Sequence, residues 1–300
     1  MRICKYMICL MLVVVLAGCT GTKIKFGTAG VGGNYYVFGQ AYTELASQDH
    51  GEIEFEVKKT AGSDANLRLL SQGYLQMAIA QMDAIALSDL SGFKAVASLY
   101  TEYVQVIARD EGITSINDLK GKVVSIGEAE SGTARNANHV LQAHGLTGRL
   151  VTTKNMTYSD AAAALMDGSI DAMFITSGAQ TTVVESLTKE GMHLVPITSS
   201  VIENLIEAYP FYAKAMIPSG TYSNQSEDIP TIGISAVLIA SDKLSSDTVK
   251  KLTESLFAHA NDLKVTVLAI KELNEENAVK NISIEFHPGA LAYYQEKGVK

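Results

Sequence analysis

The fold of this chain is limited above all by a recurring pattern: a short apolar strand, a glycine-rich turn and the start of a helix. At its first occurrence, residues 24–26 predict the strand, residues 27–33 the turn and Asn34 the helix N-cap. Glycine lets the backbone approach another group closely, because no Cβ intervenes. The first N–H groups of a helix have no partner inside it and favour an anion. We interpret this segment as the floor of a small-molecule site.

A dinucleotide-binding fingerprint would occupy the same place, and it requires G-x-G-x-x-G between a strand and a helix. Gly30 and Gly32 fit the first two glycine positions, but Tyr35 stands at the third. The spacing therefore argues against nucleotide binding. A tight turn without a ligand remains the simpler alternative. Tyr35 and Tyr36 add two hydroxyl groups and two apolar ring faces at this spot.

The pattern returns in the middle of the chain, where residues 123–126 predict a strand, 127–133 a second turn and 133–144 a helix capped by Ser131. Further strands are expected at residues 53–58, 77–80, 93–100, 103–109, 150–153, 172–175 and 231–240. This alternation predicts an α/β fold with parallel sheets covered by helices. We expect two lobes with a ligand cleft between them, because helix starts gather at the carboxyl ends of the strands.

The polar passage at residues 113–122 reads as the entry to the second lobe. We therefore expect lobe 1 to comprise residues 23–109 together with 235–300, and lobe 2 to comprise residues 110–234. A helical stretch at residues 246–268 belongs to the returning part of lobe 1. The first lobe would then be a discontinuous domain.

Neutral hydrogen-bonding residues stand at these turns, and together they could hold a ligand without reacting with it. They are Asn34, Tyr35, Ser63, Asn66, Gln81, Ser131, Thr133 and Thr176. Each of them could instead serve only as a helix cap. The two roles are compatible, since both place a polar side chain at the carboxyl end of a strand.

The N-terminus has the pattern of a bacterial lipoprotein signal peptide. Arg2 and Lys5 form a positive region, and residues 7–16 form an apolar run that is too short to span a bilayer. The sequence Leu-Ala-Gly-Cys then ends at Cys19 and matches a lipobox. We expect residues 1–18 to be removed and Cys19 to carry lipid, which would anchor the protein to a membrane in the periplasm or at the cell surface. The mature chain would then hold no free thiol.

Several other functions lack their residue patterns. Loss of Arg2 and Lys5 takes the formal charge from −8 to −10, which argues against nucleic-acid binding. The six histidines show no H-E-x-x-H spacing, and the chain has no G-x-S-x-G elbow and no P-loop. We therefore expect no metal, no cofactor and no catalytic residue, and interpret the protein as a binding protein rather than an enzyme.

Ten short segments, spread over nearly all of the mature chain, carry a resemblance to a known family. They are residues 27–36, 60–70, 80–83, 97–100, 119–127, 131–133, 168–174, 209–212, 217–222 and 287–290. In this order they resemble the TAXI-type solute-binding receptors that serve TRAP transporters.

This resemblance implies a type II-like periplasmic-binding-protein fold that closes over its solute and delivers it to an ion-coupled membrane permease. Relatives of this type bind glutamate, glutamine or small organic acids such as 2-oxoglutarate. By position, the resemblance adds to the residues above the ligand contacts Gly32, Gly33, Tyr36, Gly132, Ser177 and Gly178. A receptor for an ATP-driven importer and an enzyme on the same scaffold remain the alternatives.

The second turn departs from the family pattern, because it carries Glu128 and Glu130 where relatives tend to have small neutral residues. Two carboxylates would repel a dicarboxylate unless they face solvent. They could instead contact an ammonium group. This difference favours an amino acid over a purely anionic acid.

Overall fold

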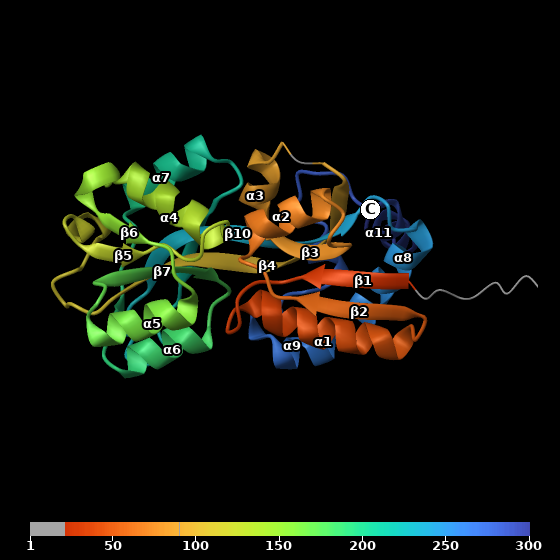
Figure 1. Cartoon of the computed structure of the whole chain (residues 1–300), viewed down its shortest axis with the longest axis horizontal. Coiled ribbons are helices and arrows are strands. Elements are labelled where there is room, and N and C mark those ends of the chain that lie inside the picture. The colour runs from red at the N-terminus through yellow and green to blue at the C-terminus, as the bar shows by residue number, and fades with distance from the viewer. Residues whose placement is uncertain (1–21, 90) are drawn as a thin grey trace, which may run out of the picture.

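The computed structural model describes residues 22–89 and 91–300, and it consists of two halves that lie side by side (Figure 1). The predicted signal peptide and Cys19 lie outside the described residues. Within residues 22–89 and 91–300, no helix is long and apolar enough to cross a membrane.

The first half contains three parallel strands with helices between them. β1 pairs with both β2 and β3 in parallel register, as the strand–turn–helix pattern predicted. Its elements are β1 (Thr22–Gly27), α1 (Asn34–Asp49), β2 (Ile53–Lys58), α2 (Ser63–Ser71), β3 (Met77–Gln81) and α3 (Met82–Leu87).

The second half repeats this arrangement, with β5 parallel to β6 and β7. Its elements are η1 (Ile116–Leu119), β5 (Val123–Ser125), α4 (Gly132–Ala143), η2 (Gly148–Leu150), β6 (Thr152–Lys154), α5 (Tyr158–Asp167), β7 (Ala172–Ser177), α6 (Thr182–Lys189), β8 (His193–Leu194), α7 (Ser199–Ala208) and β9 (Ala213–Ile217).

Two long strands, β4 (Phe93–Ala108) and β10 (Ile229–Ser241), run through both halves. β4 pairs with β10 up to Tyr103 and from Tyr103 onward with β7, in both cases antiparallel. The prediction of a break at residues 101–102 is wrong. The backbone stays extended there, because β4 has one partner strand before this point and another after it. The expectation of parallel pairing is likewise wrong for β4 and β10, and the sheet is mixed, in the order β2-β1-β3-β10-β4-β7-β5-β6.

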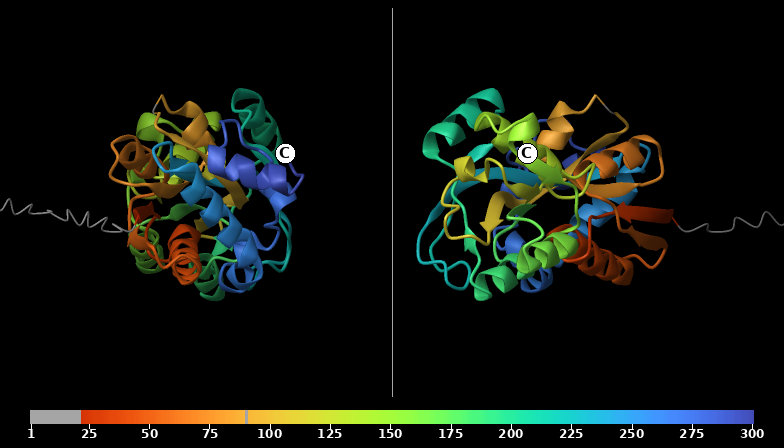
Figure 2. Two further views of the ribbon diagram at one scale, coloured as in Figure 1. Left: turned by 90° about the vertical axis from the view of Figure 1, so that its right-hand side faces the viewer. Right: turned by 60° about the vertical axis from the view of Figure 1, so that its left-hand side comes forward.

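The last segment of the chain packs on the first half. Figure 2 shows these blue helices beside the red α1, and Tyr42 of α1 donates a hydrogen bond to the Leu252 carbonyl at 2.8 Å. The stretch 246–268 is helical, as predicted, and is divided into two helices that a 3-10 turn follows. The elements are α8 (Ser246–Ala258), α9 (Ala260–Thr266), η3 (Leu268–Ile270), α10 (Glu275–Ala278) and α11 (Pro288–Glu296).

Apolar side chains between the sheet and the helices hold each half together. In the first half, Phe26, Phe38 and Tyr42 are almost fully buried, and the rings of Phe38 and Tyr42 stack at 5.5 Å. Full burial of one such side chain contributes about 1.5–3 kcal/mol. Packing of this kind positions the helix starts that surround the site.

The caps of two helix starts were predicted, and one of the two predictions is wrong. Helix α1 begins at Asn34 and is capped by Gly33, so the expectation of Asn34 as the N-cap is wrong. The side chain of Asn34 is therefore free to face the region between the halves. By contrast, Ser131 caps α4 as predicted, because its hydroxyl accepts a hydrogen bond from the Ala134 N–H at 3.0 Å.

Candidate functional site

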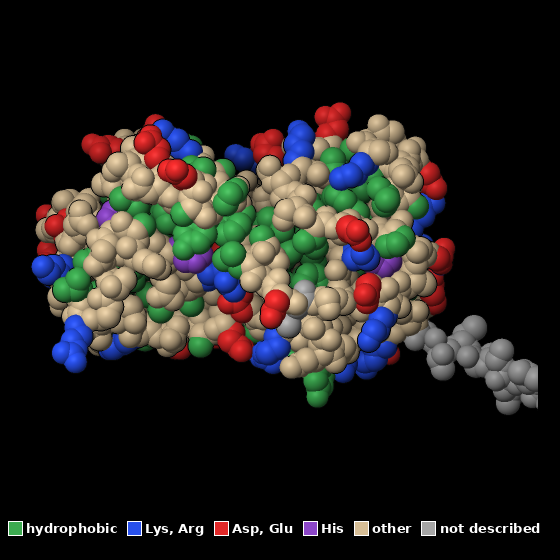
Figure 3. Space-filling model, turned by 90° about the horizontal axis from the view of Figure 1, so that it is seen from above, with side chains coloured by type: hydrophobic (Ala, Val, Ile, Leu, Met, Phe, Trp, Pro, Cys, Tyr) green, Lys and Arg blue, Asp and Glu red, His purple; other side chains and the backbone are tan. Residues whose placement is uncertain are grey.

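A small cavity lies between the two halves, where the starts of three helices face one another. Its volume is about 350 Å³, counting the part that opens to solvent. It is lined by Ala29, Gly33, Asn34, Tyr35, Ala61, Gly62, Ser63, Gln81, Glu102, Ser131, Gly132, Thr133, Tyr158, Thr176 and Ser177. The outline of the molecule narrows between the halves in Figure 3, and charged side chains of both signs meet at this waist.

Most of the residues predicted for the ligand site line this cavity. They are Gly33, Asn34, Tyr35, Ser63, Gln81, Ser131, Gly132, Thr133, Thr176 and Ser177. They come from three helix starts and from the ends of β3 and β7, so the structure brings together segments far apart in the sequence. Their role in binding remains a prediction.

Four predicted residues do not line the cavity: Gly32, Tyr36, Asn66 and Gly178. Asn66 is fully buried and ties the first turn to β3, since its amide donates to the Thr28 carbonyl at 2.7 Å and to the Ile79 carbonyl at 2.8 Å. Gly178 packs directly behind the wall, where a Cβ would come within 2.8 Å of the Asn34 amide nitrogen. Asn66 and Gly178 therefore support the wall and do not form its surface.

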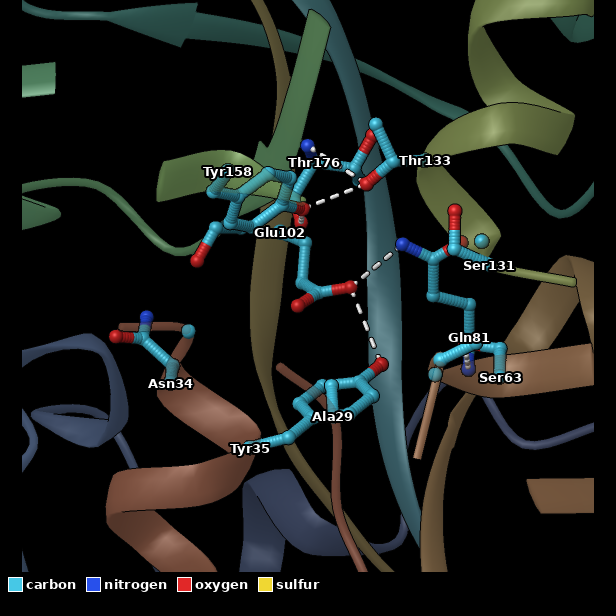
Figure 4. A pocket seen from close by; sticks show the side chains of 15 residues that line it. Ala29, Asn34, Tyr35, Ser63, Gln81, Glu102, Ser131, Thr133, Tyr158 and Thr176 are labelled. Carbon is cyan, nitrogen blue, oxygen red and sulfur yellow. Dashed lines mark hydrogen bonds between the residues drawn. The ribbon is translucent and has the colours of Figure 1, made fainter. Parts of the chain in front are cut away.

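A buried carboxylate, Glu102, lies in the middle of the cavity wall (Figure 4). Its Oε2 accepts hydrogen bonds from the Gln81 amide at 2.7 Å and from the Tyr35 hydroxyl at 3.2 Å. Its Oε1 accepts one long bond of 3.3 Å from the Tyr100 hydroxyl. Every protein group that contacts this carboxylate is therefore neutral.

Burial controls the protonation of Glu102. Removal from water disfavours the charged form and raises the pKa of Glu102 to about 8, although the bonds from Gln81, Tyr35 and Tyr100 act in the opposite direction. None of the residues lining the cavity is Lys, Arg or His. The site therefore holds an acidic group that is mainly protonated at neutral pH and ionises near pH 8.

The opposite wall is neutral and internally bonded. The hydroxyl groups of Tyr158 and Thr133 lie 2.6 Å apart, and the Tyr158 hydroxyl also donates to the Thr176 carbonyl at 3.0 Å. The Thr176 N–H donates to the Thr133 hydroxyl at 3.2 Å. This network joins α4, α5 and β7, and it fixes the shape of the second half's side of the cavity.

Three polar atoms at this site have no hydrogen-bond partner in the described part of the chain: Asn34 Nδ2, Gln81 Oε1 and Thr176 Oγ1. The residues Gln81 and Thr176 are only 2% and 5% exposed. A buried polar group without a partner costs stability. Such atoms are what a polar ligand would contact on entering the cavity.

The two acidic residues of the second turn lie elsewhere. Glu128 lines an adjoining cavity of about 570 Å³ that also contains Lys59. Glu130 forms an exposed ion pair with Arg68 at 2.7 Å across the two halves. The expectation that these carboxylates could meet the ligand does not hold for this cavity, because Glu130 is already paired and neither residue lines it.

The sequence pattern of the NMT1-like family matches residues 26–298, which is almost the whole of the described chain. The chain belongs to the NMT1-like family. The match includes both long strands and every segment that lines the cavity, so the site of this NMT1-like protein is part of the family's common region.

Solved structures similar to this NMT1-like protein have the two-lobed fold of periplasmic binding proteins. The substrate-binding protein of an amino acid ABC transporter is 14% identical, with a TM-score of 0.51, and the match covers 84% of this chain and 100% of that one. The GluR0 ligand-binding core from Nostoc punctiforme, solved with L-glutamate, is 15% identical, with a TM-score of 0.51 and coverage of 83% and 100%. A putative L-cystine ABC transporter from Listeria monocytogenes is 17% identical, with a TM-score of 0.51 and coverage of 82% and 94%. The α/β two-lobed fold predicted from the sequence is thus confirmed.

Sequence reasoning missed Glu102 and Tyr158. Glu102 was assigned to a break between two strands, and Tyr158 lies in a stretch to which no binding role was assigned. A signal for Glu102 was present, since it is a lone charged residue between apolar runs and is flanked by Tyr100 and Tyr103. No such signal in the sequence distinguished Tyr158.

Proposed function

We propose that this protein is a lipid-anchored extracytoplasmic receptor that binds a small carboxylate solute and delivers it to a membrane permease. The solute class is an amino acid of the glutamate or glutamine kind, or a small 2-oxo or dicarboxylic acid. The observation that carries the proposal is the cavity between the two halves, which is lined by helix starts and, apart from Glu102, by uncharged residues. Helix starts of this kind stabilise a carboxylate.

A binding role is also supported by the chemistry that the cavity lacks. Ser63 accepts a hydrogen bond from the Gln81 N–H at 3.1 Å, and Ser131 is engaged as the cap of α4. No histidine lines the cavity. A serine nucleophile needs a base within hydrogen-bonding reach, so these serines are not arranged for covalent catalysis. The proposal therefore describes a receptor and not an enzyme.

The permease proposed as partner is of the TRAP type, and the receptor is proposed to be of the TAXI type. Ten segments in family order support this assignment. Cys19 would carry the lipid, after removal of residues 1–18. The proposal keeps lobe 1 as residues 23–109 with 235–300 and lobe 2 as residues 110–234, which agrees with the change of partner strand of β4 at Tyr103.

A receptor for an ATP-driven importer is the second candidate, because two of the similar structures are proteins of ABC transporters. Uptake into proteoliposomes that contain the candidate permease separates the two. Uptake that stops when the ion gradient is dissipated and ignores ATP supports the TRAP assignment. Uptake that requires ATP supports the second candidate.

The receptor function is tested by binding to the chain that starts after Cys19. A ligand at about 100 times its dissociation constant stabilises a protein by about 2.7 kcal/mol, which raises the unfolding midpoint by several degrees. The panel comprises the L-amino acids, their 2-oxo acids and C4 dicarboxylates, and mass spectrometry identifies any solute released on denaturation. A midpoint rise that Gln81→Ala abolishes and that Gln40→Ala, at an exposed position of α1, leaves intact supports the proposal. No midpoint rise and no released solute would overturn it.

A further inference from the structure

The carboxylate of Glu102 is buried beside the cavity and has no cationic partner. It is 3% exposed, none of its hydrogen-bond donors is charged, and within residues 22–89 and 91–300 it takes part in no ion pair. An ionised carboxylate in such a place is costly unless a positive charge or a proton compensates it. The compensating group therefore has to be a proton in the empty cavity or a cation that enters with the ligand.

The oxygen atoms that lack strong donors lie on one wall. Glu102 Oε1 accepts only the 3.3 Å bond from Tyr100, and Gln81 Oε1 accepts none. In Figure 4 the carboxylate of Glu102 lies between the side chains of Tyr35, Gln81 and Tyr158. An ammonium group offers three N–H donors and no acceptor. It therefore matches a wall that presents acceptors.

The rest of the cavity has the opposite polarity. Helices α1 and α4, of 16 and 12 residues, both begin at the cavity, through Asn34 and Gly132. Their first N–H groups carry the positive end of the helix dipole and favour a carboxylate. A positive wall and a negative wall in one small cavity fit a zwitterion.

We propose that Glu102 and the Oε1 atom of Gln81 form an ammonium subsite, which selects an α-amino acid over the corresponding 2-oxo acid. This inference rests on the proposed receptor function. A 2-oxo acid would place a carbonyl oxygen, which is an acceptor, where the amino acid places its ammonium group. That carbonyl oxygen would face the Gln81 Oε1 acceptor and, once Glu102 is ionised, a carboxylate, so these buried groups would stay without partners.

The pH dependence of affinity should report this subsite. The titratable groups that face Glu102 are Tyr35 from α1, Tyr100 from β4, Tyr158 from α5 and Asp83 from α3. Burial raises the pKa of each tyrosine, so these hydroxyls stay neutral between pH 6.5 and 8. Burial also raises the pKa of Asp83, to about 6, which is below this pH range.

An ammonium ligand binds the ionised form of Glu102 and displaces its proton. With a Glu102 pKa of about 8, amino acid affinity should rise by nearly tenfold per pH unit well below pH 8 and should level off above about pH 8. A 2-oxo acid that accepts a hydrogen bond from protonated Glu102 should show no rise across this window and a loss above it. Calorimetry in two buffers of different ionisation enthalpy counts the proton that is released.

The experiment compares wild type, Glu102→Gln and Glu128→Gln in the chain that starts after Cys19. Each variant replaces one carboxyl group with an amide, but Glu128 lies in the adjoining cavity and is partly exposed. The probes are the L-amino acids and their 2-oxo acids, titrated at pH 6.5, 7.0 and 7.5. Glutamine keeps the size of Glu102, and the thermal midpoint of each empty variant shows that it folds.

Wild type should bind one amino acid at least tenfold more tightly than its 2-oxo acid. Glu102→Gln should lower that affinity by about 10- to 100-fold and remove the pH slope, while Glu128→Gln changes it by less than threefold. Amino acid binding that survives Glu102→Gln within threefold would overturn the subsite. Preferential binding of 2-oxo acids would overturn the subsite and leave the receptor function standing. Binding of neither set, with no solute released on denaturation, would overturn both.

Discussion

The two walls of the cavity differ in the charge and in the hydrogen bonding of their side chains. The first half contributes Glu102, Gln81 and Tyr35, where a buried carboxylate has only neutral donors and one amide oxygen has no partner. The second half contributes Tyr158, Thr133 and Thr176, whose hydroxyl and backbone groups bond mainly to one another. The first wall can change its charge with pH or ligand, whereas the second holds a fixed shape. Changes to the first wall should therefore alter pH dependence, and changes to the second should alter stability and fit.

The largest effect is expected from Glu102→Gln in the empty protein. The folded-state pKa of Glu102 is about 8, above the ordinary value of 4.5, so the folded state holds its proton longer than the unfolded state. Its contribution to stability is therefore fully present below about pH 4.5 and is lost as pH rises to about 8, by roughly 1.4 kcal/mol per pH unit. Glu102→Gln should remove this loss. Urea unfolding of both proteins from pH 5 to 9 measures it, and parallel curves would contradict the assignment.

The next largest effect is expected where the two walls meet. A Cβ on Gly132 would lie 2.0 Å from Gln81 Oε1 and 2.4 Å from its amide carbon, so Gly132→Ala should displace the Gln81 side chain. Overpacking typically costs about 1–3 kcal/mol, which corresponds to a loss of ligand affinity of about 5- to 150-fold where the cost falls on the bound state. Gly51→Ala is the matched control, because a Cβ there meets nothing within 4 Å. Equal affinity for both variants would show that Gln81 does not need this position.

A smaller effect is expected within the neutral wall. Tyr158→Phe removes the contacts to the Thr133 hydroxyl and the Thr176 carbonyl while keeping the ring. Loss of these hydrogen bonds should lower the free energy of unfolding by about 1–2 kcal/mol. The pH slope of ligand affinity should stay as in wild type, because Glu102 is unchanged. A flattened slope would mean that the two walls do not act separately.

The smallest effect is expected at the rim, where Arg68 and Glu130 form an ion pair between the halves. Both side chains are about half exposed, so water and salt screen the pair. Glu130→Gln should change ligand affinity by less than threefold at 0.15 M salt, and this change should disappear at 1 M salt. A larger effect that persists in high salt would place this pair among the determinants of closure.

The helix starts around the cavity were predictable because they depend on local chemistry. Glycine turns, Ser131 as a cap and the change from strand to helix periodicity all act within a few residues. The prediction failed at Asn34, where Gly33 caps the helix instead. Local sequence patterns could not show that Asn66 lies outside the cavity lining, because its hydrogen-bond partners, Thr28 and Ile79, are distant in sequence.

The sequence did not predict that β4 is one continuous strand. Thr101 and Glu102 interrupt its apolar run and indicate a turn, yet β10 pairs with this segment on one side and the Gln81 and Tyr35 side chains bond to the carboxylate. These partners keep the backbone extended and make a charged residue tolerable at the centre of the sheet. The continuous strand therefore places Glu102 in the cavity wall.

The sequence by itself determined the α/β alternation, the two-lobed fold and the segments that begin each helix at the cavity, because short-range periodicity and turn chemistry specify them. Only the tertiary structure decided that Glu102 and Tyr158 face each other across the cavity and that Glu130 pairs with Arg68 instead. Strand register and the packing of the two halves bring these groups together. Such long-range pairings arise from the summed contacts of the whole chain, and no local pattern encodes them.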